Sequence, residues 1–190
     1  MLVVARDDVH RLDRLITDIS EASRLDAQLS RAKFDPVDIG AMIAALLETR
    51  ARRGTAREVR LVFDRREGES LVTLGDGSRL ERVFENLIDN AISFSPDGGM
   101  VTISANRDDG MLIVRVEDEG PGVPHDAREA IFRRFQSIRP EGEAFGRHSG
   151  LGLAIARTIV EGHQGTIAVE SREDRLSGAR FLVTLPLANG

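Results

Sequence analysis

Two asparagines four residues apart, Asn86 and Asn90, are the side chains of this sequence whose type and spacing point most directly to chemistry. In a helix their amides lie one above the other on one face. Asparagine is a poor helix former, because its amide competes for backbone groups. An amide oxygen is a hard, neutral ligand suited to Mg2+, which completes its shell with water and substrate phosphates. The pair therefore indicates a magnesium and phosphate site, or else a surface helix with two tolerated asparagines.

The segment that must position these amides, 80–94, has the pattern of an amphipathic helix. Its apolar residues recur three and four positions apart: Leu80, Val83, Phe84, Leu87, Ile88 and Ala91. This spacing predicts a stripe that faces the core. Asp76 is the expected N-cap, because aspartate oxygens accept hydrogen bonds from the first amides of a helix.

A second candidate is Asp118, which follows a hydrophobic run and precedes Gly120 and Gly122. A carboxylate at the end of a strand can accept a hydrogen bond from an exocyclic amine, and would discriminate against a carbonyl oxygen at that place. Two glycines and a proline (Pro121) exceed what a simple turn needs, although an ordinary acidic turn is the alternative.

A third candidate is the turn Gly150-Leu151-Gly152, which opens an expected helix over 153–161. The first N–H groups of a helix carry partial positive charge and suit a phosphate. Alone, this short motif is weak evidence, because a plain helix-start turn looks the same. Phe132 and Phe135 lie between the two glycine motifs and are expected to pack inward from a short helix. The segment 136–149 is long, charged and glycine-containing, which is typical of a mobile lid or of an ordinary surface loop.

The order of these motifs, with a further glycine stretch at 178–181, resembles the asparagine box, first glycine box, phenylalanine box and later glycine boxes of the sensor histidine kinase ATP-binding domain. That domain belongs to the GHKL ATPase superfamily. The resemblance covers about 34–190. It implies an α+β protein with the Bergerat (GHKL) fold: a two-layer α/β sandwich, with a mixed sheet, helices on one face and a long helix in front.

The resemblance also assigns roles to individual residues. Asn90 would be the principal Mg2+ ligand, with Asn86 supporting metal and phosphate, and Asp118 would accept the adenine amino group of ATP. Ser93 and Ser137 stand where many relatives carry a basic residue, so Arg139 or Arg147 would supply the missing charge. The nucleotide-binding residues expected on this basis are Asn86, Asn90, Ser93, Asp118, Gly120, Gly122, Arg134, Ser149, Gly150, Leu151 and Gly152.

Glu85 is the catalytic candidate together with Asn86. In the fast-hydrolysing members of the superfamily, a glutamate four residues before the metal asparagine activates water. Here that position is Asn86, whose amide cannot act as a base, and Glu85 lies one residue earlier, about 100° around the helix. A solvated surface carboxylate is the alternative for Glu85. Slow hydrolysis, with transfer of the phosphoryl group to an external histidine, is therefore expected.

Residues 1–33 form the first expected domain, and 34–190 the ATP-binding catalytic domain. The apolar stripe of the first segment resembles the second helix of a histidine kinase dimerisation domain, which implies a homodimer; packing on its own domain is the alternative. The first helix of that domain, with the phosphoacceptor histidine, is missing from the sequence. The four histidines are each expected to be structural or solvated: His10, His125, His148 and His163. Autophosphorylation by this chain alone is therefore not expected.

The remaining pattern predicts the elements around these motifs. We expect a linker over 34–38, because Pro36 interrupts a helix, followed by a helix over about 37–52. The expected strands are 59–63, 71–74, 101–106, 111–117, 166–170 and 180–185. Those at 101–106 and 111–117 should form a hairpin, with Val101, Ile103 and Ala105 on one face.

Composition bounds the function. The chain has 190 residues, 41% of them hydrophobic, and a net charge of −5, which argues against a general nucleic-acid surface. It has no run long enough to span a membrane and no cysteine, which fits a reducing cytoplasm. By resemblance, the parent protein would be an inner-membrane sensor that carries this part in the cytoplasm and signals to a response regulator.

The resemblance therefore implies the ATP-binding core of a protein-histidine kinase, which would use ATP and Mg2+ to phosphorylate a histidine on a separate helix. Two alternatives stay open. One is a serine/threonine kinase or hydrolase of the same superfamily. The other is a nucleotide-binding or partner-binding module without kinase activity.

Overall fold

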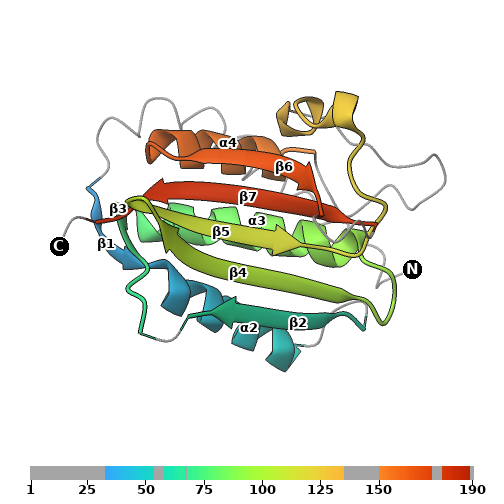
Figure 1. Ribbon diagram of the computed structural model, residues 1–190, viewed down its shortest axis with the longest axis horizontal. Helices are drawn as coiled ribbons and strands as arrows, with labels where there is room; N and C mark the ends of the chain where they lie inside the picture. The colour runs from blue at the N-terminus through green and yellow to red at the C-terminus, as the bar shows by residue number, and fades with distance from the viewer. Residues whose placement is uncertain (1–32, 54–57, 67, 135–149, 173–176, 189–190) are drawn as a thin grey trace, which may run out of the picture.

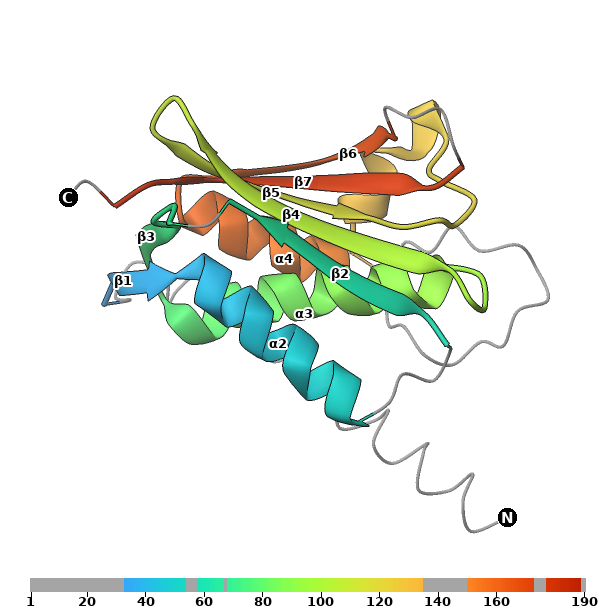
Figure 2. The ribbon, with the colours of Figure 1, turned by 60° about the horizontal axis from the view of Figure 1, so that its bottom comes forward.

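One mixed sheet of five strands organises the computed structural model, which describes residues 33–53, 58–66, 68–134, 150–172 and 177–188. Within these residues, helices cover one face of the sheet (Figure 2), as expected for a two-layer α+β sandwich. The strand order is β2-β4-β5-β7-β6 (Figure 1). The strands are β2 (Arg60–Arg65), β4 (Met100–Asp108), β5 (Met111–Glu117), β6 (Thr166–Ser171) and β7 (Ala179–Pro186).

The sheet is mixed because β2 runs parallel to β4, whereas the other pairs are antiparallel. β4 and β5 form the predicted hairpin, whose turn holds Asp109 and Gly110 at positive φ. The alternation predicted for β4 is confirmed: Val101, Ile103 and Ala105 are buried under the helices.

The central helix, α3 (Gly77–Phe94), lies between α2 (Ile39–Arg53) and α4 (Gly152–Gly162) in Figure 2. Its start is capped as predicted, because the Asp76 carboxylate accepts a hydrogen bond from the N–H of Arg79. The predicted apolar stripe is confirmed, and it is the buried face of the helix: Leu80, Val83, Phe84, Leu87, Ile88 and Ala91. The opposite positions are therefore free to carry polar chemistry.

The expected linker over 34–38 is wrong in one respect, because most of it is a strand. β1 (Asp35–Asp38) pairs antiparallel with β3 (Val72–Gly75), and α2 begins at Ile39 rather than near residue 37. The side chain of Asp38 accepts a hydrogen bond from the N–H of Ala41, which fixes the helix start. Pro36 is tolerated because β1 has a single neighbour in its two-stranded sheet.

The short helix expected around Phe132 is reduced to 3-10 turns, η2 (His125–Ala127) and η3 (Ala130–Phe132). Phe132 packs inward as predicted, edge-on to Phe181 with ring centroids 6.4 Å apart. Phe135, the expected lid 136–149 and the expected helix within 1–33 lie outside the described residues. In the part of the chain that the structure describes, no helix has the length and apolarity to cross a membrane.

Candidate functional site

The asparagine helix and the Gly150–Gly152 turn meet in the structure. The Asn86 amide nitrogen donates to the carbonyl oxygen of Gly152, 3.2 Å away. The contact is tight, because a Cβ on Gly152 would lie 3.2 Å from Asn86 Oδ1. Sixty-six residues of sequence separate the two positions, so the fold alone brings them together.

The turn before α4 has the geometry of a helix start without a side-chain cap. Gly150 has φ +68°, and Leu151 is buried and provides no capping hydrogen bond. The first backbone N–H groups of α4 have no hydrogen-bond acceptor within the helix, because no helical turn precedes them. They lie beside Asn86, and together these groups suit an anion next to a cation.

Asp118 lies at the end of β5 and is only 2% exposed. Its Oδ1 accepts two backbone hydrogen bonds, from Gly120 N–H at 2.9 Å and Ala179 N–H at 3.1 Å. Burial raises the pKa of Asp118, while the N–H groups of Ala179 and Gly120 and the charge of Arg172 act in the opposite direction. Both of these hydrogen bonds go to Oδ1. Within the part of the chain that the structure describes, Oδ2 therefore remains available to accept a hydrogen bond from a ligand.

The absence of a side chain at Gly120 allows the turn that follows Asp118 to pack closely against the end of α3. A Cβ on Gly120 would lie 2.8 Å from the carbonyl oxygen of Phe94, the last residue of α3. Near its middle, α3 therefore contacts the Gly150–Gly152 turn through Asn86. At its end, through Phe94, it contacts the turn that follows Asp118. Asn90 lies between these two contacts along the helix, so all three motifs border one region.

Two residues of the site were not assigned from the sequence, Gly178 and Ala179. Besides accepting the N–H of Asp118 at 3.0 Å, Ala179 supplies one of the two hydrogen bonds to its Oδ1. Gly178 has φ +133°, and a Cβ there would lie 2.0 Å from the carbonyl oxygen of Asp118. Only glycine fits, so the stretch 178–181, which the sequence marked merely as a glycine motif, forms the back wall of the aspartate turn.

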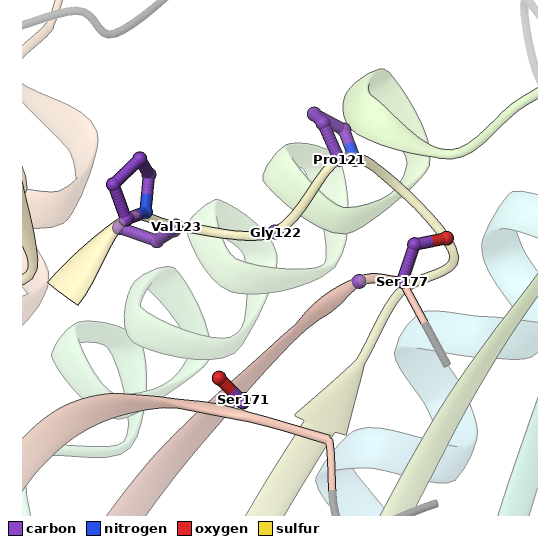
Figure 3. Close-up of a pocket in the computed structure, with 7 residues that line it drawn as sticks. Pro121, Gly122, Val123, Ser171 and Ser177 are labelled. Atoms are coloured by element: carbon purple, nitrogen blue, oxygen red, sulfur yellow. The ribbon is translucent and has the colours of Figure 1, made fainter. Parts of the chain in front are cut away.

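A pocket of about 270 Å3 lies next to this turn rather than on the aspartate itself (Figure 3). Pro121, Val123, Ser171 and Ser177 are among its walls, with the backbone of Gly178. Asp118, Asn86 and Gly152 do not line it. Gly122, a predicted nucleotide-binding residue, does line it, so the pocket adjoins the region of the three motifs at the aspartate turn.

Asn90 offers the donor chemistry that Mg2+ takes. The described residues contain no group of three or more His, Cys, Asp or Glu that could hold a metal. They also give the half-buried Asn90 amide no hydrogen-bond partner, which leaves its oxygen available. One or two protein oxygens with phosphates and water suit Mg2+, so the residues present fit such an ion.

Glu85 lies on the side of α3 that faces α2, away from the contact with α4. Burial raises its pKa, and the nearby charge of Arg50 lowers it. Arg50 itself donates twice to Asp89 Oδ1, at 2.8 and 3.1 Å, one turn along. This surrounding favours a structural carboxylate, and its catalytic role stays a prediction.

The other predicted residues are placed as follows. Ser93 is half-buried on α3, and Arg134 is exposed after η3. Ser149, Ser137, Arg139 and Arg147 lie outside the described residues, as do His10 and His148. His125 is exposed, whereas His163 is buried, in keeping with the expectation that each is solvated or structural.

Comparison with known proteins bears on this arrangement. The family described as "Histidine kinase-, DNA gyrase B-, and HSP90-like ATPase" matches residues 75–189. The sensor protein ChvG of Rhizobium meliloti (strain 1021) is 44% identical over 195 residues, which cover 98% of this chain and 34% of ChvG. The ChvG of Agrobacterium fabrum is 43% identical over 95% of this chain and 32% of its own length. The chain thus spans about a third of these relatives.

A solved structure of similar size is the mycobacterial sensor histidine kinase MprB, with a TM-score of 0.67 and 30% identity. The match covers 80% of this chain and 97% of the chain in that solved structure. Full-length ShkA in complex with AMPPNP gives a TM-score of 0.72 at 27% identity, over 94% of this chain and 37% of ShkA.

Proposed function

This chain belongs to the histidine kinase-, DNA gyrase B- and HSP90-like ATPase family, and from that premise we propose that it is the ATP-binding catalytic core of a two-component sensor histidine kinase. It binds ATP with Mg2+ and delivers the γ-phosphoryl group to a histidine on a separate helix. The observation that carries this proposal is the hydrogen bond between Asn86 and Gly152, since it sets a metal-type amide beside the anion-binding start of α4. The 44% identity to a sensor protein supports the kinase over a serine/threonine kinase, a hydrolase or a non-enzymatic module.

Adenine is recognised by Asp118 in this proposal. Its Oδ1 is occupied by Gly120 and Ala179, and Oδ2 accepts the adenine amino group. Guanine carries a carbonyl oxygen at that place and would meet a carboxylate oxygen, so GTP is rejected. The complex of ShkA with AMPPNP supports an adenine nucleotide as the ligand of this fold.

The phosphates lie between α3 and the start of α4. Asn86, Ser93 and the amides of the turn Gly150–Gly152 would contact them, and Ser149 and Arg134 remain predicted nucleotide-binding residues. Asn90, supported by Asn86, would hold Mg2+, and the ion would supply positive charge to neutralise the phosphates. Positioning and charge neutralisation account for most of the catalysis in such transfers, so this domain supplies little covalent chemistry. The nucleophile is the acceptor histidine.

The partners follow from the same proposal. Residues 1–33 are the second helix of the dimerisation domain and hold a homodimer, and 34–190 are the catalytic domain. The acceptor helix and a response regulator are the protein partners. The domain acts on the cytoplasmic side of a membrane sensor.

Calorimetric titration with ATP and GTP, each with and without Mg2+, tests the nucleotide site. We expect micromolar affinity for ATP, about −8 kcal/mol, with dependence on Mg2+ and loss in Asn90→Ala. Asn106→Ala, on β4 and away from α3, is the matched control and should bind like the wild type. The absence of heat with either nucleotide would overturn the proposal.

Transfer to a separately supplied acceptor helix tests the kinase activity. Labelled phosphate from γ-labelled ATP should appear on the histidine of that helix, and not on this chain. Nucleotide binding without transfer would favour the non-enzymatic module.

A further inference from the structure

His163 is a buried imidazole whose two nitrogens are both hydrogen-bonded to the backbone. It is 3% exposed and directly follows α4. Nε2 accepts from the N–H of Asp76 at 3.0 Å, and Nδ1 lies 2.7 Å from the carbonyl oxygen of Ile159. A backbone N–H can only donate and a carbonyl can only accept, so the ring is neutral and carries its proton on Nδ1.

The surroundings of the ring are fitted to it. A Cβ on Gly75 would lie 2.7 Å from His163 Cδ2, so glycine is required where the chain enters α3. The ring of Phe34 stacks on the imidazole, with centroids 4.7 Å apart and planes 8° apart. The imidazole therefore contacts the start of α3, the end of α4 and the segment through which the chain enters the domain.

The hydrogen bond between Asp76 and His163 is one tie between the α3 and α4 regions, and the hydrogen bond between Asn86 and Gly152 is another. The helices run antiparallel, so Asp76 at the start of α3 meets His163 beyond the end of α4, while Asn86 meets Gly152 at the start of α4. Ten positions separate the two ties along α3 and eleven along α4, about 15 Å at 1.5 Å per residue. The buried face of α4 already packs on the core, and two hydrogen bonds at this distance add to that packing in fixing the register of the helix.

We propose that His163 is a positioning residue for the nucleotide site: by accepting from Asp76 N–H, it holds α4 in the register that places Gly152 against Asn86. The inference rests on the proposed function and assigns to the imidazole an action at a distance from the phosphates. Because the ring of Phe34 stacks on the imidazole, Phe34 belongs to the same group of contacts around His163.

The pH dependence of the imidazole charge distinguishes a hydrogen-bonding role of His163 from simple packing of its ring. Burial lowers the pKa of His163; the Ile159 carbonyl and Asp76 act against this, and Arg79 adds to it. Protonation would place an N–H on Nε2 against the N–H of Asp76. Because the folded-state pKa lies below the ordinary value of about 6.5, the tie is intact above that value and is lost as the pH falls through the lowered pKa.

Two substitutions separate the effect of the hydrogen-bonding nitrogen atoms on nucleotide affinity from the effect of the aromatic ring. His163→Phe keeps an aromatic ring for Phe34 to stack on but has no acceptor. His163→Gln places an amide oxygen at about the reach of Nε2, and does not titrate. We expect His163→Phe to bind the ATP analogue AMPPNP about ten-fold more weakly at pH 7.5, the effect of one lost buried hydrogen bond. His163→Gln should restore most of the affinity.

The pH profile gives the deciding comparison. Affinity in the wild type should fall more steeply below pH 6.5 than in His163→Gln, because Asp118 and all other groups are common to both. Nitrogen NMR of the wild-type imidazole, which needs no substitution, should show Nε2 unprotonated above that pH and its protonation coinciding with the loss of affinity.

Equal affinity of folded His163→Phe and wild type would overturn the inference, and so would an affinity that does not change when Nε2 is protonated. His163→Gln that binds as weakly as His163→Phe at every pH would overturn it as well. A wild type that binds no nucleotide at any pH would instead contradict the proposed function.

Discussion

The amide of Asn86 lies 3.2 Å from the carbonyl oxygen of Gly152, and the missing side chain of Gly152 is what allows this approach. An added methyl group would stand against the amide oxygen and carbon of Asn86. Asn86, the predicted metal and phosphate residue, and the Gly150–Gly152 turn therefore pack closely together. Substitutions at the two positions should affect folding and nucleotide binding to different extents.

Gly152→Ala should weaken binding without unfolding the protein. The new Cβ would displace the Asn86 amide, whereas alanine is the better residue in a helix by about 0.5 to 1 kcal/mol. We expect ATP affinity to fall about ten-fold, because the Asn86 amide is displaced. The melting temperature should stay close to that of the wild type, because the lost Asn86–Gly152 hydrogen bond and the gain from alanine oppose each other. Gly77→Ala is the control, because a Cβ at that helix start would make only an ordinary contact, 3.8 Å from Val37 Cγ2, and the variant should keep its affinity. Reduced stability with unchanged affinity would contradict this role for Gly152.

Asp118→Asn should separate adenine recognition from folding. The asparagine oxygen can accept the N–H groups of Gly120 and Ala179, but its NH2 group would then face the adenine amine, donor against donor. We expect at least about a ten-fold loss of ATP affinity, because hydrogen bonds to charged groups are the stronger ones. Preference for ATP over GTP should fall as well.

The stability of Asp118→Asn should differ from that of the wild type in a pH-dependent way. Burial raises the pKa of Asp118, so its ionisation costs stability above that raised pKa and costs nothing below the ordinary value. The variant should therefore match the wild type at low pH and be at least as stable at pH 7. Asp108→Asn, at an exposed position on β4, is the control. A large loss of stability at neutral pH would mean that the carboxylate is structural.

Gly178→Ala should unfold the back wall of the aspartate turn. Its φ of +133° and a Cβ 2.0 Å from the carbonyl oxygen of Asp118 combine strain with collision. Gly110 also has a positive φ, +76°, but a Cβ there would meet nothing within 4 Å, so Gly110→Ala should cost only about 1 to 2 kcal/mol. Urea denaturation should show a clearly larger loss for Gly178→Ala. Equal losses would mean that the turn moves aside to admit the methyl group.

Glu85→Gln tests the catalytic assignment of Glu85. Burial raises the pKa of this carboxyl, so its charge costs stability above the raised pKa, and that cost disappears below about 4.5, near its ordinary value. The variant should melt at a higher temperature than the wild type at pH 7.5, and equally at low pH. Glu81→Gln, on the exposed side of α3, is the control.

Phosphoryl transfer to the acceptor helix gives the second readout for Glu85→Gln. Because Glu85 faces α2 and Arg50 rather than Gly152, we expect the rate to stay within about two-fold of the wild type, well short of the hundred-fold or greater loss of a general base. A loss of that size would restore Glu85 as a catalytic residue.

Much of the fold could be predicted because hydrophobic periodicity is a local property. The stripe from Leu80 to Ala91 fixes which face of α3 is buried, and the alternation from Val101 to Ala105 does the same for β4. Local chemistry likewise placed the cap at Asp76. The strand formed by Asp35–Asp38 was missed, since its partner strand β3 lies more than thirty residues away and proline argues against a strand.

The candidate site was predicted in its residue types but not in its contacts. Sequence alone determined that two amides share one helical face and that Asp118 precedes a glycine turn, because bonded spacing decides such things. Only the tertiary structure decided that Asn86 meets Gly152, that Gly178 and Ala179 close on Asp118, and that His163 receives the amide of Asp76. These pairs lie 60 or more residues apart, and their approach depends on how the buried faces of helices and sheet pack together. No local pattern records that packing.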